Sequence, residues 1–259
     1  METFIIVIMF LIFIVWLVID QYNLRRPASS RKGSSEKINN NKLAPIKQEI
    51  MNLEFEDSNK TFGKYLIFDV ETTGLPIRRN AKPQDFSNWP YVVQISWLLF
   101  DDEGKCIEFK NHYIKQEIEI PMEAIQIHGI TTEMIKEKGV TPQIVYSEFY
   151  NALNRTEYLI AHNIEFDLPI IHCELLRNGV TEEFHNKKII CTMKTGTNFC
   201  KIPLSNGGYK YPTLTELYQK CFYSDNVTLK IKSMHRANID AGLTAKCFFR
   251  LKELNIIRK

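Results

Sequence analysis

The longest run of apolar residues lies near the amino-terminal end of the chain, at residues 4–19. At 1.5 Å per residue a helix of this length reaches about 24 Å, a little less than the bilayer hydrocarbon core of about 30 Å. Only Glu2 is charged before the run, and no small-residue cleavage site follows it. We therefore expect a transmembrane anchor at residues 1–22; the alternatives are a cleaved signal peptide and a docked core helix.

A polar, basic segment follows the apolar run. Residues 25–47 contain seven basic residues against one acidic residue, Glu36. Such a composition cannot bury enough apolar surface to fold alone, so we expect a disordered linker at residues 23–60. The basic flank predicts that this side of the anchor faces the cytoplasm. The tract could contact anionic lipid or a nucleic-acid backbone, although a solvated linker is the plainer interpretation.

From residue 61 to 259 the pattern is that of a folded domain. Apolar runs predict strands at 64–70, 91–100 and 107–114, and the turn residues Asp102 to Gly104 predict a hairpin between the last two. Residues 76–90, rich in Pro, Asn and charge, read as a loop. Further strands are expected at 158–161 and 189–190, and helices from Thr131, and at 141–153, 165–177, 213–222 and 237–254. This order favours an α/β fold in which helices cover a mixed sheet.

Composition adds only weak constraints. The chain of 259 residues is 44% hydrophobic and 24% charged, with a net charge of +3, which permits an anionic partner without requiring one. Its six cysteines include no C-x-x-C pair, so a metal-thiolate site is disfavoured. We expect reduced cysteines in the core, which suggests a cytosolic setting for the domain.

The candidate chemistry begins at the end of the first predicted strand. Asp69 and Glu71 are two residues apart, so in a strand both carboxylates project from one face. Two like charges held this close repel each other, and burying them without a counter-ion costs several kcal/mol. A divalent cation would resolve both problems; the alternative is an ordinary buried strand ending in an acidic turn.

Two further motifs each have an ordinary explanation when taken alone. Asp167, in the segment from His162, would lie in the first turn of a helix, where an acidic residue is favoured by the helix dipole. Asp240 also lies near a helix start, which alone is unremarkable. His235, five residues before it, makes this segment a candidate for the site.

Together the three motifs resemble those of the DnaQ-like 3′–5′ exonucleases of the DEDDh type, in the ribonuclease H-like superfamily. The matching patterns are D-x-E-T-T-G at 69–74, H-N-x-x-F-D at 162–167 and H-x-x-x-x-D at 235–240, and the block at 127–131 (IHGIT) is also similar. The similarity covers residues 61–257. It implies a mixed five-stranded sheet flanked by helices.

The resemblance also implies roles for individual residues. Asp69, Glu71, Asp167 and Asp240 would hold two Mg²⁺ or Mn²⁺ ions, and His235 would take a proton from the attacking water. The substrate-binding residues would be Thr72, Thr73, Leu75, Asn163 and Phe166, with Leu75 as an apolar wedge between the last bases. Core packing is the alternative for Phe166, and a structural hydrogen bond is the alternative for His128.

These observations predict a metal-dependent exonuclease that releases nucleoside monophosphates from nucleic-acid 3′ ends. The alternatives are a proofreading subunit of a DNA polymerase and a catalytically silent nucleic-acid-binding module. We favour a free-standing enzyme without a polymerase partner, because the chain has no tail after its last predicted helix and a membrane anchor suits a moving replication complex poorly. We expect a single-pass membrane protein with its nuclease domain in the cytoplasm. Single-stranded DNA is the favoured substrate. RNA is the alternative substrate, since no residue in the sequence indicates a contact to a 2′-hydroxyl.

Overall fold

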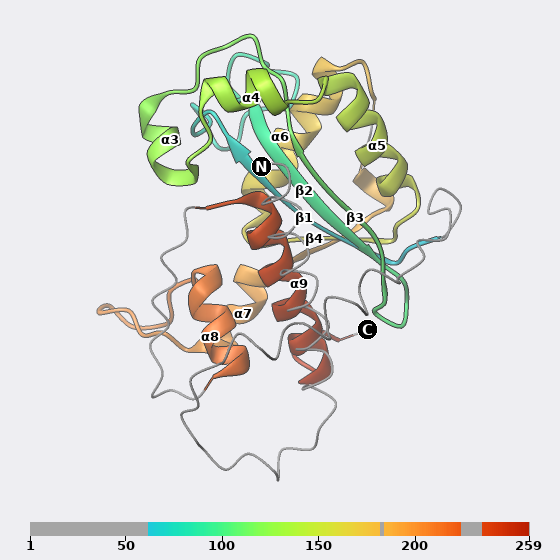
Figure 1. Ribbon diagram of the computed structural model, residues 1–259. Coiled ribbons are helices and arrows are strands. Elements are labelled where there is room, and N and C mark those ends of the chain that lie inside the picture. Colours follow the sequence, from blue (N-terminus) through green and yellow to red (C-terminus); the bar gives the residue numbers. More distant parts are fainter. Residues whose placement is uncertain (1–61, 182–183, 224–234, 259) are drawn as a thin grey trace, which may run out of the picture. The chain divides into compact units, whose positions relative to one another are not determined.

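The structure is a computed structural model that describes residues 62–181, 184–223 and 235–258 (Figure 1). The apolar run at 4–19 and the linker at 23–60 lie outside the described residues, so the anchor and the cytoplasmic orientation remain predictions. Among the described helices, none has the length and apolar character needed to cross a bilayer.

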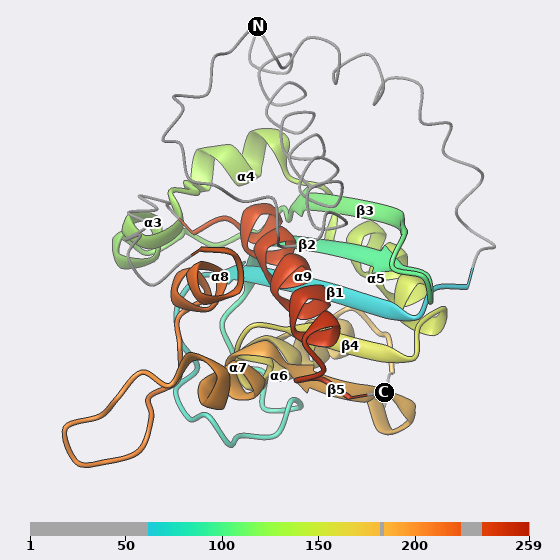
Figure 2. The ribbon, with the colours of Figure 1, turned by 90° about the horizontal axis from the view of Figure 1, so that it is seen from below.

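A five-stranded sheet with the order β3-β2-β1-β4-β5 forms the centre of the described domain (Figure 2). β1 pairs antiparallel with β2 and parallel with β4, so the sheet is mixed as predicted. The hairpin of β2 and β3 is also confirmed, and β5 lies parallel to β4 at the edge. The strands are β1 (Tyr65–Thr72), β2 (Val92–Phe100), β3 (Cys106–Tyr113), β4 (Tyr158–Ala161) and β5 (Lys188–Cys191).

Helices cover both faces of this sheet (Figure 2). On one face α5 and α6 pack against the even-numbered residues of β1, where the rings of Phe68 and Phe149 lie 5.6 Å apart. On the other face α9 packs against the odd-numbered residues, where the ring of Tyr65 lies 5.2 Å from that of Phe248. The helices are α3 (Met122–His128), α4 (Thr132–Lys138), α5 (Pro142–Asn154), α6 (Ile164–Arg177), α7 (Thr192–Cys200), α8 (Leu214–Phe222) and α9 (Ala237–Glu253).

Local capping residues explain where several helices begin and end. Thr131 accepts a hydrogen bond from the N–H of Met134, and Thr213 forms a capping box with Glu216. Thr141, at the residue before α5, makes no such side-chain hydrogen bond; Pro142 at the first helical position favours the helix instead. α6 ends at Arg177, as predicted, and the chain turns after it at Gly179, which has a φ of 76°.

Two short helices were not predicted, α3 and α7. α7 contains Gly196 and several threonines, which are weak helix formers. Its position depends on packing, because a Cβ at Gly196 would lie 2.7 Å from a methyl carbon of Leu217 in α8. The tertiary contact therefore outweighs the local propensity.

The loop at residues 76–90 is held close to the end of the sheet by one side chain. The Arg177 guanidinium donates hydrogen bonds to the carbonyls of Trp89, at 2.7 Å, and Pro90, at 3.1 Å. The same group lies 4.1 Å from the centre of the Tyr91 ring. This loop leads from β1, which carries the candidate chemistry, into β2.

None of the six cysteines forms a disulfide in the described structure. Cys173, Cys221 and Cys247 are buried in the core. Cys106 is exposed instead, because it begins β3 at the outer edge of the sheet, so the prediction of a core position is wrong for this residue.

Candidate active site

Two acidic side chains project from the end of β1 on the face that α9 covers. Asp69 and Glu71 occupy alternate positions of the strand and point to the same side. Glu71 is buried, with 8% of its surface exposed, and Asp69 is half-buried. Burial, and then the neighbouring carboxylates, raise the pKa of Asp69 well above its ordinary value and that of Glu71 to about 8. The ionised form of both carboxyl groups is therefore disfavoured here unless a cation compensates it.

A third carboxylate comes from the first turn of α6, directly after β4. Asn163 precedes this helix in the left-handed conformation, with φ 70° and ψ 45°, which asparagine tolerates better than most residues. The Asp167 carboxylate accepts a hydrogen bond from the backbone N–H of Val70 in β1. Burial nevertheless raises the pKa of Asp167 well above its ordinary value. The end of β4 thus brings Asp167 against the strand that carries Asp69.

The start of α9 supplies the fourth carboxylate and the histidine. Asp240 lies in the first turn of the helix, and His235 lies two residues before the helix begins. The Nδ1 atom of His235 is 3.1 Å from Oδ2 of Asp240, and this hydrogen bond raises the pKa of His235. The imidazole is otherwise open to solvent, with 64% of the side chain exposed.

Two hydrogen bonds from other elements hold this segment in place. The backbone N–H of Ala237 donates to Oε1 of Gln94 at 3.2 Å, and Gln94 lies opposite Glu71 in the pairing of β2 with β1. The backbone N–H of His235 donates to the carbonyl of Ile127 in α3 at 3.2 Å. The carboxylates on β1 and α9 are thus fixed relative to each other through β2.

Two of the four carboxylates, those of Glu71 and Asp240, lie close enough to share a hard divalent cation with His235, and Asp69 and Asp167 line the same cavity. Ligand atoms of Glu71, His235 and Asp240 all lie within 4.8 Å of one another. In the described part of the chain no lysine or arginine forms an ion pair with any of the four, and His235 is the partner of Asp240. A buried cluster of like charges requires protons or a cation, and oxygen ligands select ions such as Mg²⁺ or Mn²⁺.

A cavity of about 610 Å³, which we call the catalytic cavity, brings all the predicted site residues together. Besides the four carboxylates and His235, the predicted residues that line it are Thr72, Thr73, Leu75, Asn163 and Phe166. The Leu75 side chain is 78% exposed although it is large and apolar. Phe166 is only partly buried and packs against the core from the cavity side, so both interpretations of this residue hold in part.

The hydroxyls of the two threonines already have partners within the turn after β1. Thr72 donates to the carbonyl of Gly74 at 2.7 Å, which leaves its oxygen lone pairs as acceptors. Thr73 accepts from the N–H of Tyr91 at 3.0 Å and keeps its own proton to donate. The N–H of Thr73 is used in a bond to the carbonyl of Tyr91. Of these groups, the Thr73 hydroxyl is therefore the donor that is free for a ligand.

His128 forms hydrogen bonds that hold the turn after β1 in place. His128 is buried; its Nδ1 accepts from the N–H of Ile130, so its Nε2 carries the proton and donates to the Thr72 carbonyl at 3.3 Å. Burial lowers the pKa of His128, in agreement with a neutral ring. The structural interpretation of His128 thus matches its contacts, and it steadies the turn that follows Glu71.

His162 was part of a recognised motif but had no predicted role. Its Nε2 donates to the carbonyl of Pro212 at 3.1 Å, and its Nδ1 lies 3.1 Å from the Thr192 hydroxyl. Burial lowers the pKa of His162 to about 4, so the ring is neutral. These contacts tie the end of β4 to α7 and to the segment before α8. Nothing in the sequence pattern signals partners this far apart.

Comparison with known proteins identifies the family. Residues 66–248 match the Exonuclease family (RNase_T), and the chain therefore belongs to it. This confirms the resemblance to the DnaQ-like 3′–5′ exonucleases.

Individual relatives agree with this assignment. The chain is 26% identical over 190 residues to the 3′–5′ exonuclease DinG of Bacillus subtilis (strain 168), covering 73% of this chain and 18% of that protein. It is 31% identical over 110 residues to the DNA polymerase III subunit epsilon of Rickettsia conorii, covering 42% of this chain and 43% of that protein. E. coli Exonuclease I in complex with a dT13 oligonucleotide has the same fold, with a TM-score of 0.56 and 17% identity over 74% of this chain and 42% of that one. The chain spans less than half the length of each of these proteins.

Proposed function

We propose that this chain is a metal-dependent 3′–5′ exonuclease that releases nucleoside monophosphates from nucleic-acid 3′ ends. The observation that carries the proposal is the meeting of Asp69, Glu71, Asp167, Asp240 and His235 in one cavity, in a chain that belongs to an exonuclease family. A purely structural or binding role has no need for buried carboxylates that lack a basic partner.

Asp69, Glu71, Asp167 and Asp240 would hold two Mg²⁺ or Mn²⁺ ions. When bound, such ions stabilise the negative charge that develops on the attacking and leaving oxygens of an in-line displacement. The raised pKa values of Asp69, Glu71 and Asp167 support this assignment. They show that the ionised carboxylates are unstable without compensating positive charge, which a bound cation would supply in place of the protons.

His235 would act as the general base. Its Nδ1 donates to the Asp240 carboxylate, which leaves the Nε2 lone pair free to accept a proton from water. One ring nitrogen of His235 is hydrogen-bonded, and the side chain is otherwise exposed to solvent. This arrangement supports that role. Asp240 would then orient the ring and stabilise its protonated form.

The turn after β1 and the start of α6 would receive the 3′-terminal nucleotide. The exposed Leu75 and the partly buried Phe166 offer apolar surface to the bases, and the Thr73 hydroxyl offers a donor. Single-stranded DNA is the substrate we favour. Parallel digestion of DNA and RNA oligonucleotides of one sequence would decide between the two polymers, and faster cleavage of the RNA would reverse this preference.

A 5′-labelled single-stranded oligonucleotide tests the activity directly. With Mg²⁺, the wild-type chain should shorten the labelled oligonucleotide stepwise from its 3′ end. The cleavage rate of His235→Ala should be lower by a factor of about 10² to 10⁴. Asp69→Asn should be inactive as well. Full activity in either variant would refute the mechanism, and a wild type that digests no DNA or RNA would favour the silent binding module.

A proofreading subunit is the second candidate, supported by the similarity to a DNA polymerase III subunit epsilon. Purification of the chain at natural abundance separates the two candidates. We expect the nuclease without a polymerase, tethered to the membrane with its domain in the cytoplasm. Stoichiometric co-purification with a polymerase would establish the second candidate instead.

A further inference from the structure

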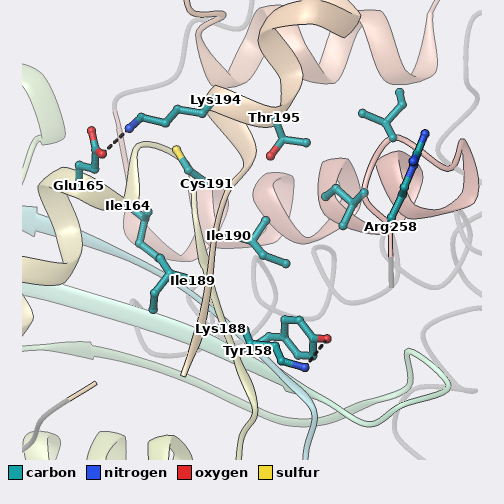
Figure 3. A pocket seen from close by; sticks show the side chains of 12 residues that line it. Tyr158, Ile164, Glu165, Lys188, Ile189, Ile190, Cys191, Lys194, Thr195 and Arg258 are labelled. Carbon is teal, nitrogen blue, oxygen red and sulfur yellow. Dashed lines mark hydrogen bonds and ion pairs between the residues drawn. The ribbon is translucent and has the colours of Figure 1, made fainter. Parts of the chain in front are cut away.

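Two more cavities adjoin the catalytic cavity and extend it towards β5. The nearer one, of about 540 Å³, shares Leu75, Asn163 and Phe166 with the catalytic cavity. The farther one, of about 670 Å³, shares Ile164, Glu165 and Ile189 with the nearer one (Figure 3). We call these two cavities together the β5 groove. Because neighbouring cavities share lining residues, the three cavities adjoin one another from the acidic site to the edge of the sheet.

The charge of the lining changes sign along this path. Among the described residues that line it, the catalytic cavity has acidic side chains and, apart from its histidines, no basic ones. The β5 groove is lined by four basic side chains and one acidic side chain, Glu165; the basic ones are Arg79, Lys188, Lys194 and Arg258. Figure 3 shows Lys188 beside Tyr158, and Arg258 on the side of the farther cavity away from Glu165. The Lys188 ammonium forms an ion pair with the Glu157 carboxylate at 2.6 Å, so its charge is partly cancelled. A negatively charged polymer would therefore find its counter-charges beyond the catalytic carboxylates.

Apolar surface accompanies these charges. Ile189 in β5 is 42% exposed, and Leu75 at the junction with the catalytic cavity is 78% exposed. Phe166 lines both the catalytic cavity and the nearer part of the groove. Basic side chains interleaved with apolar and aromatic surface are typical of sequence-independent binding of single strands, whose bases are free to contact the protein. A duplex would keep its base faces stacked inside and would leave this apolar surface uncovered.

We infer that the β5 groove binds the single-stranded nucleic acid on the 5′ side of the terminal nucleotide. The inference rests on the proposed function, which supplies the 3′ end in the catalytic cavity. Backbone phosphates contact Lys188 and Arg258 at the far end, and bases lie against Leu75, Phe166 and Ile189. The groove thus gives the enzyme a preference for strands long enough to reach β5.

Glu165 lies at the junction of the two parts of the groove and opposes the passage of phosphates. Its carboxylate is exposed and forms an ion pair with Lys194, so both charges are partly cancelled (Figure 3). Replacement of Glu165 by glutamine removes one negative charge and frees Lys194 for a phosphate. This variant should therefore bind a long strand more tightly, by roughly fivefold at 0.1 M salt, the factor that one phosphate contact carries on a single strand.

The main test is the double variant Lys188→Gln/Arg258→Gln in the full chain. Both side chains lie in the farther part of the groove and outside the catalytic cavity. Loss of two phosphate contacts should weaken binding of a single-stranded 12-mer by roughly 25-fold at 0.1 M salt and reduce the salt slope by about 1.4. Cleavage of a dinucleotide, which does not reach β5, should be unchanged. Binding is measured by fluorescence anisotropy in Ca²⁺, without dependence on turnover.

The matched control is Lys105→Gln/Lys136→Gln, which changes the net charge equally. These lysines are exposed in the β2–β3 turn and on α4, beside the opposite edge of the sheet. The control should bind the 12-mer like the wild type. Equal loss in both double variants, or no loss in the groove variant, would overturn the inference while leaving the nuclease intact. If the wild type cleaves no substrate, the proposed function fails, and the same binding comparison still decides whether the groove holds a strand.

Discussion

Replacement of Glu71 by glutamine should make the protein more stable in the absence of divalent cations. The folded state raises the pKa of Glu71 from near 4.5 to about 8, chiefly through burial and then through Asp240. Between these two values the folded chain holds a proton that the unfolded chain has lost, so the free energy of unfolding falls as the pH rises. The fall is about 1.4 kcal/mol per pH unit, or about 5 kcal/mol over the whole interval.

Glutamine keeps the shape of the side chain and does not titrate, so it removes this dependence. Above pH 8 the variant should exceed the wild type by about 5 kcal/mol, which for a domain of this size corresponds to about 10–20 °C in Tm. Near pH 4.5 the two should be equally stable. The gap widens further because Glu71 also raises the pKa of Asp69 and Asp167.

Thermal and urea unfolding in EDTA between pH 4.5 and 8.5 measures this gap. Glu103→Gln, in the exposed β2–β3 turn, is the control and should follow the wild type at every pH. Addition of Mg²⁺ should stabilise the wild type by mass action and the variant much less, so the order at pH 8 reverses at sufficient Mg²⁺. Parallel pH curves for wild type and Glu71→Gln would refute the reasoning about the carboxylate cluster.

Three further predictions concern the supports of the site and the anchor. His128→Ala removes the hydrogen bond to the Thr72 carbonyl and should lower both the unfolding free energy, by about 1–3 kcal/mol, and the cleavage rate; a change in neither would contradict its supporting role. Thr213→Ala removes the capping box of α8 and should cost about 1 kcal/mol in urea unfolding with normal cleavage. After high-speed centrifugation of a lysate, the full chain should sediment with membranes and a chain without residues 1–22 should not. Recovery of the full chain in the supernatant would rule out the anchor.

The strands and the long helices could be predicted because each is specified locally. The apolar run of β1, the turn before β3, and the glycine after α6 are all visible within a few residues. α7 could not be predicted, since its glycine and threonines favour other conformations and the contact of Gly196 with Leu217 in α8 depends on the tertiary structure. The exposure of Cys106 was missed for a similar reason, because an edge position depends on the order of strands in the sheet.

The residues of the site could be predicted from the motifs, but the hydrogen bonds that hold these residues in place could not. Asp69, Glu71, Asp167, Asp240 and His235 belong to recognisable patterns, and the structure brings them into one cavity. The bonds that hold them join residues far apart in sequence, and a pattern within one segment cannot show them. The same limit explains why the β5 groove became apparent only in three dimensions.

The hydrogen bond between Gln94 in β2 and the backbone of Ala237 at the start of α9 has a consequence for the newly made protein. Asp69 and Glu71 are made before His235 and Asp240, which lie much later in the sequence. Until that segment packs onto β1 and β2, the acidic pair has neither its fourth carboxylate nor its base. A chain in which the segment from His235 has not yet been made or packed would therefore lack nuclease activity towards the nucleic acids around it.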